Sequence, residues 1–206
     1  MKLEVLNSKR KDLLKSLYKF SDFYLVGGTA LALQLGHRTS VDFDLFSDKI
    51  INPSLLLSKT QRIFQGRKVA RKLKHSDQVS ILVDDVKIDF VHCKYPLVLK
   101  PIELNKLKMA QAKEIAAMKA FALNFRGTTK DYIDLYFVLK EKVVTLSDIE
   151  KIGEKKYKDE FNFRLFLNQL LLLEDLEDTE IEFFKKEPTK EEMQQLFKSE
   201  IAKIKL

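Results

Sequence analysis

Apolar residues recur at helical spacing over residues 3–20, which predicts an amphipathic helix there. Shorter apolar runs follow and predict further elements. FYLV at 23–26 predicts a short buried strand. ALALQL at 30–35 predicts a helix that ends at Gly36, because glycine frequently follows the last helical residue. VDFDLF at 41–46 alternates between apolar and acidic residues and therefore predicts the next strand.

A helix and three strands are predicted next. Pro53 lies near the start of a helix that runs to about Gln65, since proline is favoured in the first helical turn. KVARKL, VSILV and KIDFVH, at 68–73, 79–83 and 87–92, predict strands, and a hairpin-like turn joins the last two. These elements predict a mixed sheet with flanking helices.

After about residue 104 the pattern predicts helices throughout. The first helix runs over 107–125 and the second starts near Thr129. The third starts at Ser147, with Glu150 in capping-box spacing, and the last starts at Thr189, with Glu192 in the same spacing. The predicted class is α+β, with an α/β domain at 1–104 and a helical domain at 105–206. We expect the two to pack together and share one site, because no Pro/Gly-rich linker separates them.

The composition is that of a globular protein with a sizeable core. The chain has 206 residues, of which 45% are hydrophobic and 33% charged. No apolar run approaches the roughly 18 to 20 residues of a membrane span, and no signal-peptide pattern is visible. Cys93 is the only cysteine, which excludes an intramolecular disulfide and a thiolate-rich metal site. We therefore expect a cytoplasmic protein without a membrane partner.

Positive charge is concentrated in one segment, RIFQGRKVARKLKH at 62–75. The formal charge of the chain is only +7, but this segment contains lysine and arginine without any acid. Clustered cations attract polyanions, most commonly nucleic acid. The alternative is a strand edge whose lysines prevent aggregation. The sequence leaves both interpretations open.

Two aspartates lie in the predicted strand at 41–46. Alternate side chains of a strand share a face, so Asp42 and Asp44 point one way. Val41, Phe43 and Leu45 are then expected to point into the core. Carboxylates about 6 to 7 Å apart along a strand raise each other's pKa unless a cation lies between them. A hard divalent ion such as Mg²⁺ satisfies both and keeps coordination positions open for phosphates.

Asp89 offers a third carboxylate from the last predicted strand. Its neighbours Ile88 and Phe90 are apolar, which places the acid on the face opposite the core. If the two acidic strands lie side by side, three carboxylates converge and can hold two metal ions across a transferring phosphoryl group. The alternative is that these acids merely occupy polar positions of half-buried strands. That alternative is weaker for the pair on the first strand, because aspartate is depleted in strands.

A glycine pair separates the strand at 23–26 from the helix after it. Gly27 and Gly28 let the backbone approach a ligand closely and leave amides free at a helix N-terminus. This geometry binds phosphate, and Thr29 adds a hydroxyl. The turn alone is a weak signal, but a pair of aspartates about 14 residues later makes it more specific.

These motifs resemble those of a known family. GGTALALQLGHRTSVDFDLF at 27–46 is similar to the first motif of the nucleotidyltransferase superfamily that includes polymerase beta, in particular to the AbiEii/AbiGii toxin family. VKIDF at 86–90 is similar to the third acidic strand of that family. IAAMKAFALNFRGTTKDYIDLYFVL at 115–139 is similar to its helical Lys, Arg and Lys-Asp-x-x-Asp signature. Beyond about residue 145 only the general helical character is similar.

The resemblance implies a nucleotidyltransferase-like fold with an NTP as substrate and two Mg²⁺ ions as cofactors. By the same resemblance, the Gly27-Gly28 turn holds the triphosphate. Metal binding and catalysis are implied for Asp42, Asp44 and Asp89.

The helical signature adds further candidates. The resemblance implies that Lys119 and Asp131 act in catalysis, with Lys119 as a triphosphate contact. From the residues alone, Lys119 could be a lysine that extends along a helix to water, and Asp131 a helix cap. Arg126 and Asp134 are interpreted as a pair that orients the site, with Arg126 near the nucleotide.

Arg38 and Ser40 match the family pattern GHRxSxDxD and are candidate nucleotide-binding residues. Arg38 could reach a phosphate or hold Asp44 in place, and Ser40 could do the same through its hydroxyl. A structural role is equally open for both.

The predicted function is Mg²⁺-dependent transfer of an NMP from an NTP to an acceptor hydroxyl. The resemblance implies a toxin of a toxin–antitoxin or phage-defence pair, with a cognate antitoxin as partner and RNA, in particular the acceptor end of tRNA, as acceptor. The basic segment at 62–75 would suit an RNA. Alternatives are transfer to a protein or a small molecule, and a non-catalytic nucleotide-binding module.

Overall fold

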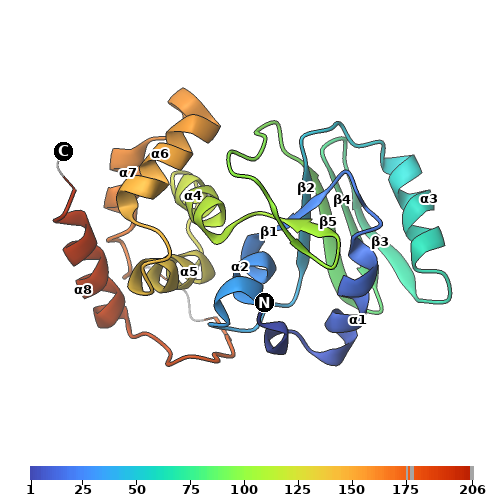
Figure 1. The fold of residues 1–206 in the computed structure, drawn as a ribbon, viewed down its shortest axis with the longest axis horizontal. Coiled ribbons are helices and arrows are strands. Elements are labelled where there is room, and N and C mark those ends of the chain that lie inside the picture. Colours follow the sequence, from blue (N-terminus) through green and yellow to red (C-terminus); the bar gives the residue numbers. More distant parts are fainter. Residues whose placement is uncertain (175, 177–178, 205–206) are drawn as a thin grey trace.

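The computed structural model describes residues 1–174, 176 and 179–204. Within these residues, seven strands form one sheet in the order β3-β4-β5-β2-β1-β7-β6 (Figure 1). The strands are β1 (Tyr24–Val26), β2 (Phe43–Ser47), β3 (Val69–Lys74), β4 (Gln78–Val83), β5 (Val86–His92), β6 (Ile102–Leu104) and β7 (Leu107–Met109). β2 is parallel to β5 and β1 to β7, whereas the other neighbours are antiparallel. The sheet is therefore mixed, as predicted.

Helices flank this sheet and form a separate group beside it. They are α1 (Ser8–Leu17), α2 (Gly27–Leu35), α3 (Pro53–Ile63), α4 (Ala112–Leu123), α5 (Thr129–Lys140), α6 (Leu146–Tyr157), α7 (Phe163–Gln169) and α8 (Lys190–Ile201), with short 3₁₀ turns η1 (Leu3–Val5) and η2 (Lys158–Glu160). In Figure 1, α1 and α3 lie beside the sheet on the right, whereas α4 to α8 are grouped on the left. The α+β class is confirmed. None of the described helices is long and apolar enough to cross a bilayer.

The first helix differs from its prediction. Residues 3–20 were expected to form one helix, but the chain forms η1, breaks, and starts α1 after Asn7. The Asn7 Oδ1 accepts a hydrogen bond from the Arg10 backbone amide at 3.0 Å, which is the interaction of a helix N-cap. The asparagine therefore starts a new helix within an otherwise helical apolar pattern.

The predicted helix over 107–125 is wrong at its start. β6 and β7 form a hairpin, and Met109 pairs with Leu25 of β1 before α4 begins. Asn105 and Lys106 have φ of 49° and 71°, the left-handed conformation that two-residue hairpin turns require. The sheet thus continues past residue 104, and β7 leads the chain directly into α4.

The predicted types of helix cap are present, although one of them uses other residues than predicted. Thr189 and Glu192 form the predicted capping box of α8, with reciprocal hydrogen bonds of 3.1 Å. The capping box of α6 uses Thr145 and Asp148 rather than the predicted Ser147 and Glu150. The predicted stop at Gly36 is confirmed, because this residue has φ of 66° and caps α2.

The basic segment at 62–75 contains the edge strand of the sheet, β3. Arg67 is not free, because its guanidinium forms ion pairs with Asp12 and, at 2.9 Å, with Asp84. An edge strand rich in cations resists pairing with another chain, which agrees with the second interpretation of this segment. RNA binding there stays a prediction.

Candidate active site

The parallel pairing of β2 with β5 brings the predicted carboxylates together. Asp44 pairs in register with Asp89, and Asp42 lies just before β2. Phe43 is fully buried, as predicted for the inward face. Val41 is 43% exposed because it precedes the strand, so its predicted place in the core is wrong. The acidic strands therefore lie side by side, as the sequence argument required.

The charges of these carboxylates are poorly compensated. Burial, together with repulsion from Asp89 and Asp42, raises the pKa of Asp44 to about 6. Burial and Asp89 also raise the pKa of Asp42, which Lys87 partly opposes. The Asp89 Oδ2 lies 2.6 Å from Lys87 Nζ, whereas its buried Oδ1 has no hydrogen-bond partner among the described residues. This cluster has more negative charge than its neighbours neutralise.

A hard divalent cation fits this cluster chemically. Carboxylate oxygens are the ligands that Mg²⁺ prefers, and the unpartnered Oδ1 of Asp89 is one such oxygen. In the described part of the chain, no three or more His, Cys, Asp or Glu side chains are yet arranged as a metal site. The ammonium of Lys87 occupies the other oxygen of Asp89. Binding of a cation would therefore require small side-chain movements.

The glycine pair is required by the packing of the site itself. Gly27 has φ of 68°, and a Cβ atom there would overlap the Asp44 Oδ2. A Cβ atom on Gly28 would lie 2.6 Å from Arg38 Nη2. Gly27 is also the first residue of α2, so the turn presents the N-terminus of that helix to the cleft. The two glycines let Asp44 and Arg38 approach the turn between β1 and α2 closely.

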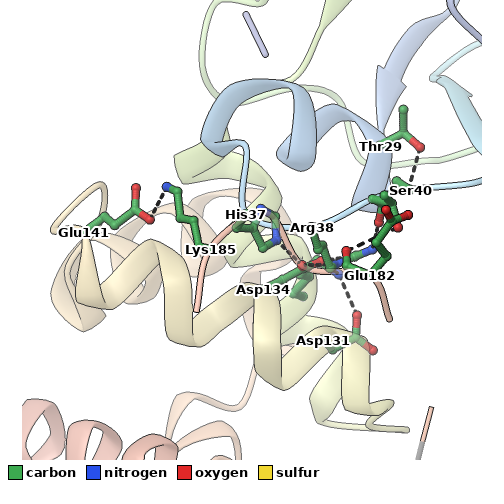
Figure 2. A network of polar contacts seen from close by, with 11 residues as sticks. Thr29, His37, Arg38, Ser40, Asp131, Asp134, Glu141, Glu182 and Lys185 are labelled. Atoms are coloured by element: carbon green, nitrogen blue, oxygen red, sulfur yellow. Dashed lines mark hydrogen bonds and ion pairs between the residues drawn. The ribbon is translucent and has the colours of Figure 1, made fainter. Parts of the chain in front are cut away.

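Thr29 and Ser40 connect α2 to the acidic strand (Figure 2). The Thr29 Oγ1 lies 2.7 Å from Ser40 Oγ and also contacts the backbone oxygen of Asp42. Thr29 is only 1% exposed, so its hydroxyl braces the segment before β2 instead of facing the cleft. Ser40 lines the cleft. The expected hydroxyl contact with a ligand is therefore better placed on Ser40 than on Thr29.

A buried ionic network centres on Asp134 (Figure 2). Arg38 donates two hydrogen bonds to this carboxylate, at 2.8 and 2.9 Å, and His37 Nε2 lies 2.6 Å from it. Burial alone would raise the pKa of Asp134, but Lys119 and Arg38 hold it far below its usual range. Arg38 thus binds Asp134 and not Asp44; because it also lines the cleft, its contact with a phosphate stays a prediction. The predicted pair of Asp134 with Arg126 is wrong.

Lys119 joins this network to the rim of the cleft. Its Nζ lies 2.8 Å from Asp131 and 2.8 Å from Asp134. Burial lowers the pKa of Lys119, but the two carboxylates raise it above its ordinary value. Asp131 also caps α5 by accepting hydrogen bonds from Thr128. Lys119 is therefore not a lysine extending to water, and Asp131 serves both as a cap and as an ion-pair partner.

A cleft of about 620 Å³ lies over these residues. It brings together most of the predicted residues, namely Gly27, Gly28, Arg38, Ser40, Asp42, Asp44, Lys119, Arg126 and Asp131. Thr29, Asp89 and Asp134 are not among its lining residues and support it from behind. The cleft thus has glycines, carboxylates and cations along one end, the set that a nucleoside triphosphate requires.

A family model described as the nucleotidyl transferase AbiEii toxin of a type IV toxin–antitoxin system matches residues 12–206. The chain belongs to the AbiEii nucleotidyltransferase toxin family. The resemblance drawn from the sequence motifs is thereby confirmed, and so is the prediction of a nucleotidyltransferase.

Relatives of this AbiEii-family chain share its sequence or its fold over most of their length. The uncharacterised protein aq_aa25 of Aquifex aeolicus (strain VF5) is 35% identical over 183 residues, which are 88% of this chain and 87% of the relative. JHP933 from Helicobacter pylori has a TM-score of 0.57 and 19% identity, covering 96% of this chain and 94% of its own. MenT4, a nucleotidyltransferase toxin from Mycobacterium tuberculosis, has a TM-score of 0.63 and 14% identity, covering 95% and 83%. The two solved structures show a common fold.

The structure also places residues in the cleft of this AbiEii-family chain that the sequence argument did not assign. Lys130 lines the cleft, and its positive charge partly opposes the burial that raises the pKa of Asp42. The sequence motif could have identified Lys130, because this residue is the lysine of the Lys-Asp-x-x-Asp signature and directly precedes Asp131. No local pattern pointed to the apolar lining residues, which come from separate elements. These are Phe46, Cys93, Tyr95, Ile115, Met118, Phe121, Ala122 and Tyr157.

Proposed function

We propose that this chain transfers an NMP from an NTP to an acceptor hydroxyl with the help of two Mg²⁺ ions held by Asp42, Asp44 and Asp89. The pairing of Asp44 with Asp89 carries this proposal, because the neighbouring Asp89 and burial together raise the pKa of Asp44, as expected of a site that needs a cation. Mg²⁺, when bound, would supply neutralisation of the charge that develops on the phosphate oxygens.

The proposed reaction is an in-line displacement at the α-phosphorus. The acceptor oxygen forms a bond to that phosphorus, the bond to the oxygen that bridges the α- and β-phosphates breaks, and pyrophosphate leaves. By analogy with the superfamily alone, we assign Asp89 as the group that helps to deprotonate the acceptor hydroxyl. Asp42 and Asp44 would hold the cations, which would supply positive charge beside the phosphate oxygens.

Cations of the chain would hold the triphosphate. The N-terminus of α2 at Gly27 and Gly28 offers amides and a favourable helix dipole to phosphate oxygens. Arg126 and Lys130 line the cleft, and we assign them to the outer phosphates. Lys119 is held by Asp131 and Asp134, so it contributes a fixed charge to the lining of the cleft. Arg38 acts through Asp134 as a positioning residue.

We further propose that the acceptor is an RNA, in particular the acceptor end of a tRNA, and that the chain acts in the cytoplasm as a toxin restrained by an antitoxin. The type IV toxin–antitoxin description of the family supports the toxin and partner. The basic edge at β3 supports a polyanionic acceptor, because Arg71 and Lys72 are exposed there.

A labelled-NTP experiment separates the acceptor classes. The protein is incubated with Mg²⁺, α-labelled NTPs and a cell extract, which is then divided into RNA, protein and small solutes. We expect the label in RNA of tRNA size. Label in protein or in a small solute would instead identify that class as acceptor, and no label in any fraction would contradict nucleotidyl transfer. Asp44→Ala is expected to abolish both the transfer and growth inhibition on expression.

A further inference from the structure

The active-site cleft has two chemically different ends. One end carries the glycine turn, the carboxylates and the cations described above. The other end is lined by apolar and aromatic side chains from four separate parts of the chain: Phe46, Tyr95, Met118, Phe121 and Tyr157. Charged groups bind phosphates, whereas an aromatic wall binds a flat and weakly polar ring. The two ends together match the two ends of one nucleotide.

Strand β2 sets the distance between the two ends. Asp42, Asp44 and Phe46 alternate along β2 and its N-terminal extension, and all three line the cleft. Successive residues on one face of a strand lie roughly 7 Å apart. Phe46 therefore lies one such step beyond the carboxylate proposed to hold the metal at the α-phosphate. A ribose spans a comparable gap between the α-phosphate and the base of a nucleotide.

Aromatic rings that pack on one another form part of the cleft wall. Phe121 and Tyr157 are stacked face to face, with ring centroids 3.7 Å apart and planes 5° from parallel. Tyr95 packs edge-on against Tyr157, at 4.7 Å and 74°. Tyr157 is almost fully buried, whereas Phe121 is partly exposed toward the cleft. A further flat ring could continue this stack only on the exposed side of Phe121.

Buried ionic contacts outside the catalytic network hold this wall in place. The backbone oxygen of Tyr95 accepts a hydrogen bond from Lys156 Nζ at 3.3 Å, and the same ammonium lies 2.9 Å from Glu114. Glu114 in turn accepts hydrogen bonds from the backbone amides of Val98 and Leu99. A site whose shape is fixed before binding loses little entropy when the ligand enters.

We propose that this aromatic end binds the nucleobase of the NTP, with Phe121 as the principal stacking residue. The inference rests on the proposed nucleotidyl transfer and deepens it. It identifies the base of the NTP, rather than the acceptor, because the base and the α-phosphate belong to one molecule and the cleft volume of about 620 Å³ suits a whole nucleotide.

The test compares ligands with and without a base. Binding of ATP, GTP, CTP and UTP, each with Mg²⁺, is measured by calorimetry beside inorganic tripolyphosphate, which has the phosphates but no ring. Phe121→Leu keeps an apolar side chain of similar volume and removes the flat surface. We expect the Kd of the best-bound NTP to rise roughly tenfold, the size of a lost base stack, and the Kd of tripolyphosphate to stay within about twofold.

Two further variants separate stacking from general damage. Phe23→Leu removes a partly buried ring that packs edge-on against Phe90 at 5.1 Å, away from the cleft, and should leave both Kd values unchanged. Phe121→Trp restores a flat ring, and because the chain has no other tryptophan its fluorescence should respond to an NTP and not to tripolyphosphate.

Three results would overturn the inference. An unchanged NTP affinity in Phe121→Leu would exclude stacking on this ring. An equal loss of NTP and tripolyphosphate affinity would indicate a distorted cleft. A higher KM for the acceptor with an unchanged Kd for the NTP would assign the aromatic end to the acceptor. If the wild-type protein binds no NTP at all, the proposed function itself fails, which is a different outcome from all three.

Discussion

The ionised carboxylate of Asp44 is proposed to bind a metal, but its charge is unfavourable for folding. Its pKa of about 6 is raised by burial and by the neighbouring Asp89 and Asp42, so the folded state resists its ionisation. A carboxylate in that position is unfavourable unless a cation is bound. The same property makes the residue suitable for holding a metal at neutral pH.

Asp44→Asn should therefore stabilise the metal-free protein. The pKa of Asp44 in the folded protein lies above the ordinary 3.8. Protonated Asp44 therefore favours the folded state fully below pH 3.8, and this contribution to the free energy of unfolding is lost as the pH rises through about 6. In EDTA at pH 7.5 we expect the variant to gain about 1 to 3 kcal/mol in free energy of unfolding over the wild type. Urea unfolding measures this difference, which should shrink toward pH 4. A less stable variant at pH 7.5 would contradict the uncompensated charge.

Asp134 shows the opposite behaviour, because its charge is fully compensated. It receives Arg38, His37 and Lys119 in a buried position. Asp134→Asn leaves the buried Arg38 without a carboxylate partner and leaves Lys119 with Asp131 alone, and we expect a loss of about 3 to 5 kcal/mol in free energy of unfolding. The control is Asp22→Asn, which breaks an exposed ion pair with Lys49 and should change stability little. Equal effects of the two substitutions in urea unfolding would contradict the structural role of Asp134.

At the scale of elements, the turn between β1 and α2 determines how closely the acidic strand approaches the helix. The order strand, glycine turn, helix, acidic strand could be predicted because each step has a local signal: an apolar run, a glycine pair and an alternating DxD. β6 and β7 could not, because each is only three residues long and too short for a periodic pattern. The pairing of β7 with β1 depends on contacts distant in sequence, and β6 joins the sheet only through β7.

Alanine substitutions at two glycines with positive φ test whether the turn needs glycine for its backbone conformation or for the space beside it. Gly66 has φ of 83° with no atom within 4 Å of an added Cβ, whereas a Cβ on Gly27 would overlap Asp44. Both alanine variants incur the left-handed strain of about 1 kcal/mol, but only Gly27→Ala displaces the carboxylate. We expect Gly66→Ala to retain nucleotidyl transfer and Gly27→Ala to lose at least 100-fold in kcat/KM, on the order of 3 kcal/mol. Similar activities would show that Gly27 is needed for its conformation alone.

At the scale of the whole molecule, the candidate site combines residues of the sheet with residues of α4 and α5, two helices that pack against α2. The acids come from β2 and β5, whereas Lys119 and Asp131 come from α4 and α5. The sequence could name these residues from the resemblance, but it could not place the aromatic end of the cleft. Phe46, Phe121 and Tyr157 are far apart in the chain and meet only in the folded structure.

A ligand that bridges both parts should stabilise the entire chain. We expect Mg²⁺ with a non-hydrolysable NTP analogue to raise the Tm, since binding at 100 times Kd stabilises the folded state by about 2.7 kcal/mol. EDTA should reverse the metal-dependent part of this shift. In Asp44→Asn the addition of Mg²⁺ should cause no further increase, and a full increase in that variant would place the metal elsewhere.

Transfer of label from the α-phosphate tests the central claim most directly. The wild-type protein is incubated with Mg²⁺, cell extract and NTP that carries the label on either the α- or the γ-phosphate, beside Asp44→Ala as the inactive control. The account predicts that α-label enters the acceptor, that γ-label leaves in pyrophosphate, and that the variant transfers neither. Transfer of γ-label to the acceptor, or α-transfer by Asp44→Ala at the wild-type rate, would contradict it.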